Sequence, residues 1–161
     1  MFAIGDKIVY PMHGAGVIEA VEEKKILGEV RRYYILRVSF GDMKVMIPCD
    51  SSDMIGVRGV ISPDETPHVM EVLGNESTEM SGNWNRRYRE NMAKLRTGET
   101  CSVAEVVRNL MRVDRIKKLS TGEKKMLANA KQILISELIL AINEGAAELE
   151  MRIERVVCGF D

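Results

Sequence analysis

The pattern of hydrophobic and polar residues predicts β-strands in the first 60 residues. Apolar side chains there come in short runs, several of which alternate with polar ones and stop at Gly or Pro. Small turns are expected at His13 to Gly16 and at Gly41-Asp42, and a loop from Lys24 to Glu29. Such strands favour a small, strongly bent sheet or barrel. The predicted strands are Asp6 to Tyr10, a segment that begins with Val17 to Val21, Arg31 to Phe40, and Met43 to Ile47.

From residue 83 onward the apolar period becomes helical. Trp84, Tyr88, Met92 and Leu95 are spaced 4, 4 and 3 residues apart, which places them on one helix face. Asn83 can cap this helix, and Gly98 is well placed to end it. Three further helices are expected, so that the whole half forms a small helical bundle. They begin at capping boxes in Ser102 to Glu105 and Ser120 to Glu123, the second running to about Asn143, and at Ala146, the last ending at Val157.

The segment between these two parts reads as a connection. Ser62-Pro63-Asp64-Glu65 resembles a capping box, but Pro67 conflicts with a helix that runs straight through it. A short helix from about Pro67 to Leu73, stopped by Gly74, is therefore expected before a polar loop. The sequence thus predicts an α+β protein with a β domain over residues 1–60, a connection over 61–82 and a helical domain over 83–161.

The charge distribution adds a candidate partner. The 161 residues have a net charge of −1, yet residues 84–132 contain 13 Lys and Arg residues against 5 Asp and Glu residues, a local charge of +8. A basic block of this kind favours contact with nucleic acid. The alternative is a helical surface whose cations are simply solvated.

The start of the first predicted helix concentrates this charge around the only tryptophan. Arg86, Arg87 and Arg89 occupy the turns where acidic residues are usual, because the helix dipole is positive there. Free backbone N–H groups and three guanidinium groups together favour a phosphate. Trp84 then has two interpretations: it packs into a core, as aromatic residues at helical spacing usually do, or it meets a nucleobase by stacking or as a wedge.

Other classes of function find little support in the sequence. The chain has two histidines and contains no P-loop, zinc-protease motif or nucleophile elbow, so we expect neither an enzyme nor a cofactor or metal site. Its three cysteines form no CxxC pair, which is typical of a reducing cytoplasm. No apolar run is long enough for a bilayer, so we expect no membrane partner.

Three segments together resemble the CarD/CdnL family of bacterial transcription regulators. They are Gly5 to Gly14, Asn83 to Tyr88, and Leu119 to Leu127. The first segment is also similar to the polymerase-binding module of the transcription-repair coupling factor. That helicase has motor motifs which this sequence lacks, and the Trp-Arg segment and the helical half favour the CarD type.

The resemblance implies a fold and a mechanism. The N-terminal domain would be a Tudor-like module that binds the β subunit of RNA polymerase. The helical domain would lie on promoter DNA at the upstream edge of the transcription bubble, where Trp84 wedges into the minor groove and stabilises the open complex. The DNA contacts would be largely independent of sequence, a monomer would suffice, and the protein would be cytoplasmic and associated with the nucleoid through the polymerase.

The family's site residues transfer only where this sequence matches. Arg86, Arg87 and Arg89 take the phosphate contacts, with Lys124 and Lys125 as further DNA-binding candidates. On the polymerase-binding side, Lys24 occupies a position where a basic residue is expected. A second expected arginine is replaced by Met46, and Lys44, two residues away, can compensate.

Two other functions stay open at this point. One is a stand-alone nucleic-acid-binding protein that uses only the basic helices. The other is a structural adaptor in which Trp84 is part of a core.

Overall fold

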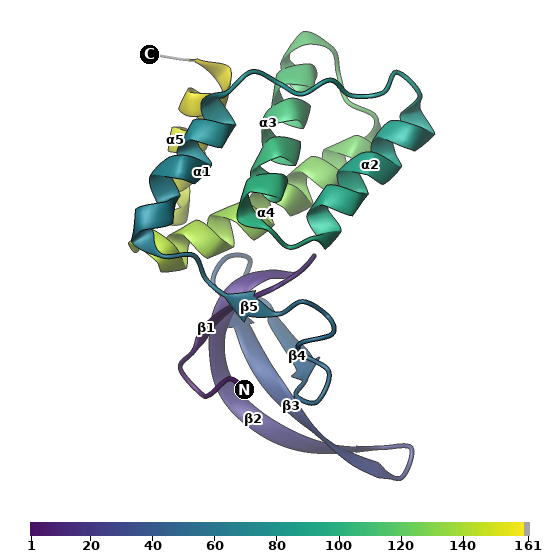
Figure 1. The fold of residues 1–161 in the computed structure, drawn as a ribbon, viewed down its shortest axis with the longest axis vertical. Coiled ribbons are helices and arrows are strands. Elements are labelled where there is room, and N and C mark those ends of the chain that lie inside the picture. The colour runs from purple at the N-terminus through teal and green to yellow at the C-terminus, as the bar shows by residue number, and fades with distance from the viewer. Residues whose placement is uncertain (160–161) are drawn as a thin grey trace.

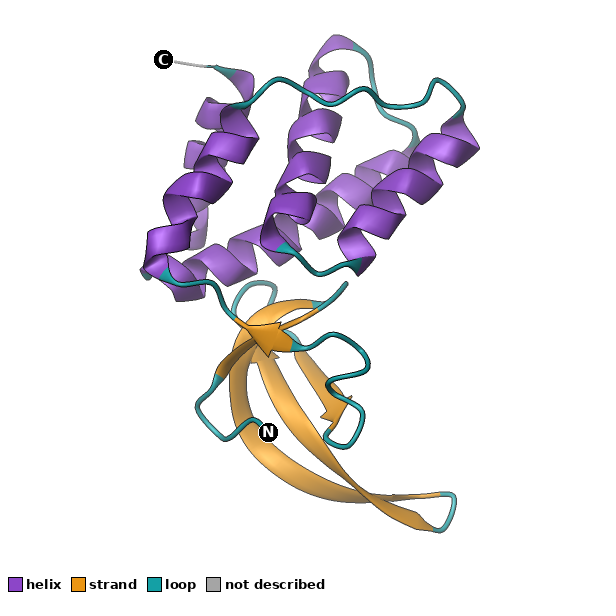
Figure 2. Cartoon of the chain, in the orientation of Figure 1, coloured by secondary structure: helices purple, strands orange, loops and turns teal. Residues whose placement is uncertain are grey.

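The computed structural model describes residues 1–159, which form a sheet and a helical bundle stacked end to end (Figures 1 and 2). The five strands come first in the chain, and the helices follow and lie together at one end of the sheet. The predicted α+β class is therefore confirmed.

The N-terminal sheet is antiparallel, with strand order β4-β3-β2-β1-β5. The sheet bends strongly along β2 and β3, as Figure 1 shows, and β2 carries a bulge between Ile18 and Ala20. One face is packed into a small core around Ile8, Leu36 and Ile47. The strands are β1 (Lys7–Tyr10), β2 (Gly14–Ile26), β3 (Glu29–Val38), β4 (Lys44–Pro48) and β5 (Arg58–Gly59).

Strand β2 is longer than the sequence pattern predicted, and two of the predicted turns are wrong. The expected turn at His13 to Gly16 lies largely within β2, where a Cβ on Gly16 would collide with the carbonyl group of Arg37. The expected loop from Lys24 to Glu29 is only a two-residue turn at Leu27 and Gly28. Both turn residues have positive φ, +50° and +81°, which suits a tight hairpin between twisted strands.

The helical half contains a short 3-10 turn and five α-helices. Helix α4 passes through it, contacting α3 and α5 within the bundle and β2 of the sheet. The core is made of large apolar side chains such as Leu110, Leu134 and Ile153, all inaccessible to solvent or nearly so. The elements are η1 (Pro63–Glu65), α1 (Thr66–Gly74), α2 (Trp84–Arg96), α3 (Thr100–Ile116), α4 (Thr121–Ile142) and α5 (Ala146–Cys158).

Most of the predicted helix ends are found where the capping residues indicated. Asn83 accepts a hydrogen bond from the Arg86 N–H at 3.0 Å, and Ser120 accepts one from the Glu123 N–H at 3.2 Å. The expected cap at Ser102 is wrong, because α3 begins at Thr100. Gly98 follows the end of α2 with a positive φ of +72°, which turns the backbone, and Glu99 is the N-cap residue of α3.

The connection also contributes to the bundle. Helix α1 packs on α3 and α5, and its Val69 and Leu73 belong to the helical core. Within residues 1–159 no single helix has the length and hydropathy to cross a membrane, although α4 and α5 together, bent by 113°, would meet that test as a pair.

Hydrogen bonds fix the two halves against each other along α4. Ser136 accepts from the Ala15 N–H at 2.8 Å, and its carbonyl group accepts from Ser39 Oγ at 2.6 Å. At the next residue, the carboxylate of Glu137 binds the guanidinium of Arg58 at 2.7 and 2.9 Å. Glu137 is only 2% exposed, so this ion pair is an internal part of the joint.

Candidate nucleic-acid interface

Trp84 lies at the surface, as the first residue of α2. Its side chain is 41% exposed and stacks on the ring of Tyr88, with centroids 5.1 Å apart and planes 20° apart. The indole N–H donates to Ser120 Oγ at 3.0 Å, and the ring lies over Gly122, where a Cβ would be 3.3 Å from Trp84 Cζ2. The interpretation of Trp84 as a core residue is therefore wrong.

Two of the three predicted arginines point into solvent near this indole. Arg86 is exposed and pairs with Glu90, one turn further along the helix, at 2.9 Å. Such exposed pairs are weak and exchange readily with water or another anion. Arg89 is exposed and has no ion pair with any residue in 1–159. Both guanidinium groups are thus available to a phosphate.

Arg87 differs from its neighbours because its guanidinium is turned toward α4. It donates to both carboxylate oxygens of Glu123, at 2.8 and 3.0 Å, and to the carbonyl oxygen of Ser81 at 3.2 Å. Glu123 is 3% exposed, so this bidentate pair lies mostly inside the protein. The sequence alone grouped Arg87 with the phosphate contacts, whereas in the structure its donors already have partners.

The pair is charged in the folded protein. The hydrogen bond from Arg87 holds the pKa of the Glu123 carboxyl below its usual value, despite the opposing effect of burial. The same hydrogen bond raises the pKa of Arg87. An ionised carboxylate, neutralised by Arg87, therefore lies in the first turn of α4.

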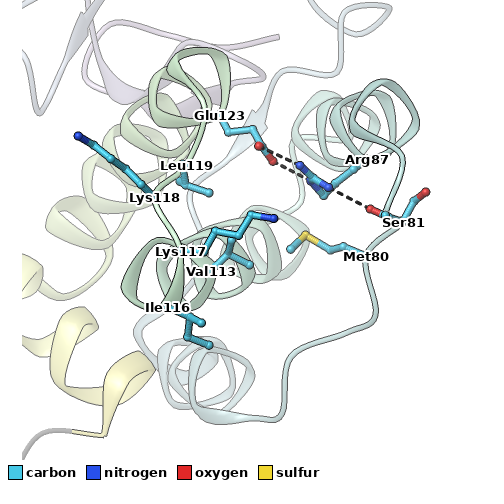
Figure 3. Close-up of a pocket in the computed structure, with 10 residues that line it drawn as sticks. Met80, Ser81, Arg87, Val113, Ile116, Lys117, Lys118, Leu119 and Glu123 are labelled. Atoms are coloured by element: carbon cyan, nitrogen blue, oxygen red, sulfur yellow. Dashed lines mark hydrogen bonds and ion pairs between the residues drawn. The ribbon is translucent and has the colours of Figure 1, made fainter.

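A pocket of about 340 Å³ opens beside this ion pair. In Figure 3 Arg87 and Glu123 approach each other on one side of it, and Lys117 and Ile116 lie across from them. Ile116 is 89% exposed, so the rim combines apolar and cationic side chains. The lining comes from the α1–α2 connection, α2, the end of α3, the α3–α4 loop and α4: Met80, Ser81, Gly82, Arg87, Val113, Ile116, Lys117, Lys118, Leu119 and Glu123.

Lys124 and Lys125 lie exposed in the first turns of α4. The hydrogen bond between Trp84 and Ser120 joins the start of α4 to the start of α2. The two predicted lysines therefore come from the same end of the bundle as the indole, and both helix dipoles contribute positive potential there. We call this surface, made of Trp84, Arg86, Arg89, Lys124 and Lys125, the tryptophan surface.

Other arginines of the basic block serve the fold. Arg108, Arg112 and Arg115 are spaced to share one helix face, and that face contacts protein. Arg108 is 2% exposed and donates to the Val72 carbonyl oxygen at 2.8 Å, and its burial lowers its pKa. Arg112 donates to the Asn75 carbonyl oxygen at 2.7 Å, and Arg115 to Glu154 at 3.2 Å. The local charge of +8 therefore overstates the cationic surface.

The residues predicted to face the polymerase lie on the outer face of the sheet. Met46 is 40% exposed and pairs with Ile35 of β3, which pairs in turn with Ala20 of β2. Lys24 is four residues beyond Ala20, so it has the same orientation, and it contacts Glu22 at 3.5 Å. Lys44 shares this face and pairs with Glu19 at 2.8 Å. The three side chains thus project from one surface, opposite the sheet's core.

Several residues around Trp84 were not singled out as site residues. Ser120 and Glu123 were interpreted only as a capping box, in which Glu123 would return to the backbone of Ser120. In the structure the carboxylate binds Arg87 and the Ser120 hydroxyl instead. The available signal was the placement of this box in the segment from Leu119 to Leu127 that carries the family resemblance.

The fold defines a two-part protein in which a sheet module and a helical module each expose a separate surface. The C-terminal part matches the family described as CarD, C-terminal domain, over residues 68–154, and the N-terminal part matches the CarD-like/TRCF RID domain over residues 2–61. A Bacillus subtilis (strain 168) protein described as "Putative transcription factor YdeB" is 47% identical over 138 residues, which cover 86% of this chain and 90% of that protein. The chain belongs to the CarD family of transcription regulators.

Proposed function

We propose that this protein binds the β subunit of RNA polymerase with the outer face of its sheet and promoter DNA with the tryptophan surface, thereby stabilising the open promoter complex. The observation that carries the proposal is the position of Trp84. A large apolar side chain stands 41% exposed at a helix start, among exposed cations rather than in a core.

The physics of the tryptophan surface suits DNA whose strands are separating. Its cations bind phosphates and so place the helical half on DNA without reading sequence. The indole interacts better with unstacked bases than with closed duplex, and only such a difference in affinity shifts an equilibrium. A stacking contact worth about 1–3 kcal/mol changes the ratio of open to closed complex by roughly 5- to 150-fold.

The sheet supplies the second contact. Its outer face combines the apolar side chains of Ala20, Ile35 and Met46 with charged residues at the edges, which suits a protein partner better than a nucleic acid. Docking there would raise the effective concentration of the tryptophan surface at the promoter. The joint along α4 would keep the two surfaces at a defined separation while both are engaged.

The experiment that tests this function is the lifetime of open promoter complexes with the matching RNA polymerase. Wild-type protein is expected to lengthen the lifetime, and Trp84→Ala to lose most of that effect while it remains folded. Met151→Ala, which removes a 61% exposed apolar side chain from α5, is the matched control and should behave as wild type. Equal lifetimes with wild type and Trp84→Ala would reject the proposal.

A stand-alone nucleic-acid-binding function predicts a different affinity of the purified protein for DNA. It requires tight duplex binding by the purified protein without polymerase, weakened steeply by salt. We expect weak binding alone, because the tryptophan surface has only four cations. Failure to co-purify with the polymerase β subunit would favour this alternative.

A further inference from the structure

The exposed indole of Trp84 is connected to the buried carboxylate of Glu123 through one hydroxyl group. Ser120 Oγ accepts from the indole N–H at 3.0 Å and from the backbone N–H of Glu123 at 3.2 Å. Its own proton is donated to Glu123 Oε1 at 3.2 Å. A hydroxyl offers one donor and two acceptor positions, so the bonding capacity of Ser120 is fully used.

The Glu123 end of this series of hydrogen bonds is also fixed. Glu123 receives two hydrogen bonds from Arg87, which is held in addition by the Ser81 carbonyl oxygen at 3.2 Å. Arg87 and Trp84 belong to the same helix, and Ser120 and Glu123 bracket the start of α4. These hydrogen bonds therefore connect the start of α2 to the start of α4 on both sides of the indole.

We propose that Ser120, Glu123 and Arg87 are positioning residues that hold the Trp84 indole in its DNA-contacting orientation before DNA is bound. The inference rests on the proposed function of the tryptophan surface. It gives Arg87 a role different from that of Arg86 and Arg89, which remain available to phosphates.

The physical reason is the cost of ordering an exposed side chain. A free tryptophan at a helix start samples several rotamers, and binding must then select one of them. Here the ring nitrogen is held by Ser120, and the ring itself by Tyr88 and Gly122. Preorganisation of this kind lowers the cost of binding without any new contact to the ligand.

Stability alone does not explain a carboxylate at position 123. A buried ion pair gains little over well-packed apolar residues of similar volume, because both charges must be desolvated. What the pair supplies at this position is directional: an acceptor that orients the Ser120 hydroxyl so that its second lone pair faces the indole N–H.

Trp84 is the only tryptophan, so its fluorescence reports directly on the mobility of this side chain. We would measure time-resolved anisotropy of the full chain without DNA, together with open-complex lifetimes. Ser120→Gly removes the hydroxyl at small cost to the helix, because glycine is also an acceptable N-cap residue. Ser120→Thr restores the hydroxyl and is the conservative rescue.

The expected result is a fast depolarisation component in Ser120→Gly and Glu123→Gln that is absent from wild type and from Ser120→Thr. Open-complex lifetimes should fall roughly 2- to 10-fold, the factor associated with ordering one side chain. Gly122→Ala should also shorten the lifetime, since its Cβ would be 3.3 Å from Trp84 Cζ2 and displace the ring. That variant removes no hydrogen-bonding group, and alanine is a better helix former than glycine, so unfolding does not explain a loss.

An equally rigid indole in wild type and Ser120→Gly would overturn the inference. So would a mobile indole with unchanged open-complex lifetimes, provided that Trp84→Ala shortens them. If Trp84→Ala has no effect on the lifetime, the proposed function fails. The anisotropy of Ser120→Gly then still decides whether the hydrogen-bond chain holds the ring, because that measurement involves neither polymerase nor DNA.

Discussion

Two glutamates on α4 are bound by arginines in nearly the same way, but they lie in different parts of the molecule. Glu123 is 3% exposed and pairs with Arg87 of α2, and Glu137 is 2% exposed and pairs with Arg58 of β5. Both pairs are bidentate, with contacts between 2.7 and 3.0 Å. What differs is the third group that each carboxylate reaches.

Glu137 completes a network of groups that all belong to the joint between the sheet and the bundle. It accepts from the Ile61 N–H at 3.0 Å and from Thr100 Oγ1 at 2.8 Å, and Arg58 also donates to the Gly98 carbonyl oxygen. Glu123 instead reaches Ser120, and through it an indole that faces solvent. The same kind of ion pair therefore serves the joint between the two halves at one position and the proposed DNA-contacting surface at the other.

The largest effect is expected when the joint is broken. Glu137→Ala leaves the Arg58 guanidinium and two further donors without their acceptor, and removal of one partner of a buried pair costs about 3–5 kcal/mol. Urea unfolding should show this as a lower midpoint. Glu150→Ala is the control, because Glu150 only forms an exposed pair with Lys131 at 3.3 Å and should change stability by less than about 1 kcal/mol.

Glu123→Ala should be less destabilising than Glu137→Ala. Besides its arginine, Glu123 accepts only from the hydroxyl of the exposed Ser120, which water can replace, whereas Glu137 also accepts from Ile61 N–H and Thr100 Oγ1. Hydrogen bonds to charged groups are worth about 1.5–3 kcal/mol. The same urea titration measures the difference. The order should be reversed for function, so that Glu123→Ala shortens the lifetime of open complexes more than Glu137→Ala does when both variants are folded. A larger stability loss for Glu123→Ala than for Glu137→Ala would contradict the comparison.

Acid should weaken the Glu123 pair in a defined direction. The hydrogen bond from Arg87 lowers the folded-state pKa of Glu123, so the unfolded chain binds the proton more tightly. The stability from this group is therefore complete above the unfolded pKa of about 4.3 and is lost as pH falls through the lower folded value. Urea midpoints of wild type and Glu123→Gln should differ most near neutral pH and converge below pH ~4. A constant difference across this range would count against the ion pair as its source.

Local interactions explain why much of this fold could be predicted from sequence. The caps at Asn83 and Ser120 depend on residues three positions away, and both are found as expected. The family resemblance likewise rests on short continuous segments. The turn after β2 was predicted too long because local composition does not show how far two strands continue to pair.

The choice of partner for each charge could not be predicted, because it is made across the fold. Arg87 and Glu123 are 36 residues apart, and Arg58 and Glu137 are 79 residues apart. Helical spacing showed that Arg108 and Arg112 share a face but not that this face contacts α1, the α1–α2 connection and α5. Counting charges along the sequence therefore located the cationic region without distinguishing arginines that hold the fold from those that face solvent.

The smallest effect on stability is expected from Arg89→Ala. Arg89 is exposed and has no ion pair within residues 1–159, so its removal should leave the urea midpoint within about 0.5 kcal/mol of wild type. If it contacts a phosphate, its loss should weaken promoter binding of the polymerase-bound protein about equally on all sequences and reduce the salt slope by about 1. Arg155→Ala, which removes an exposed arginine from α5, should change neither quantity. An unchanged salt slope for Arg89→Ala would remove Arg89 from the tryptophan surface and leave DNA contact to Arg86 and the two lysines. A reduced salt slope with unchanged stability would distinguish Arg89 from Arg87, because the loss of Arg87 must also affect the fold.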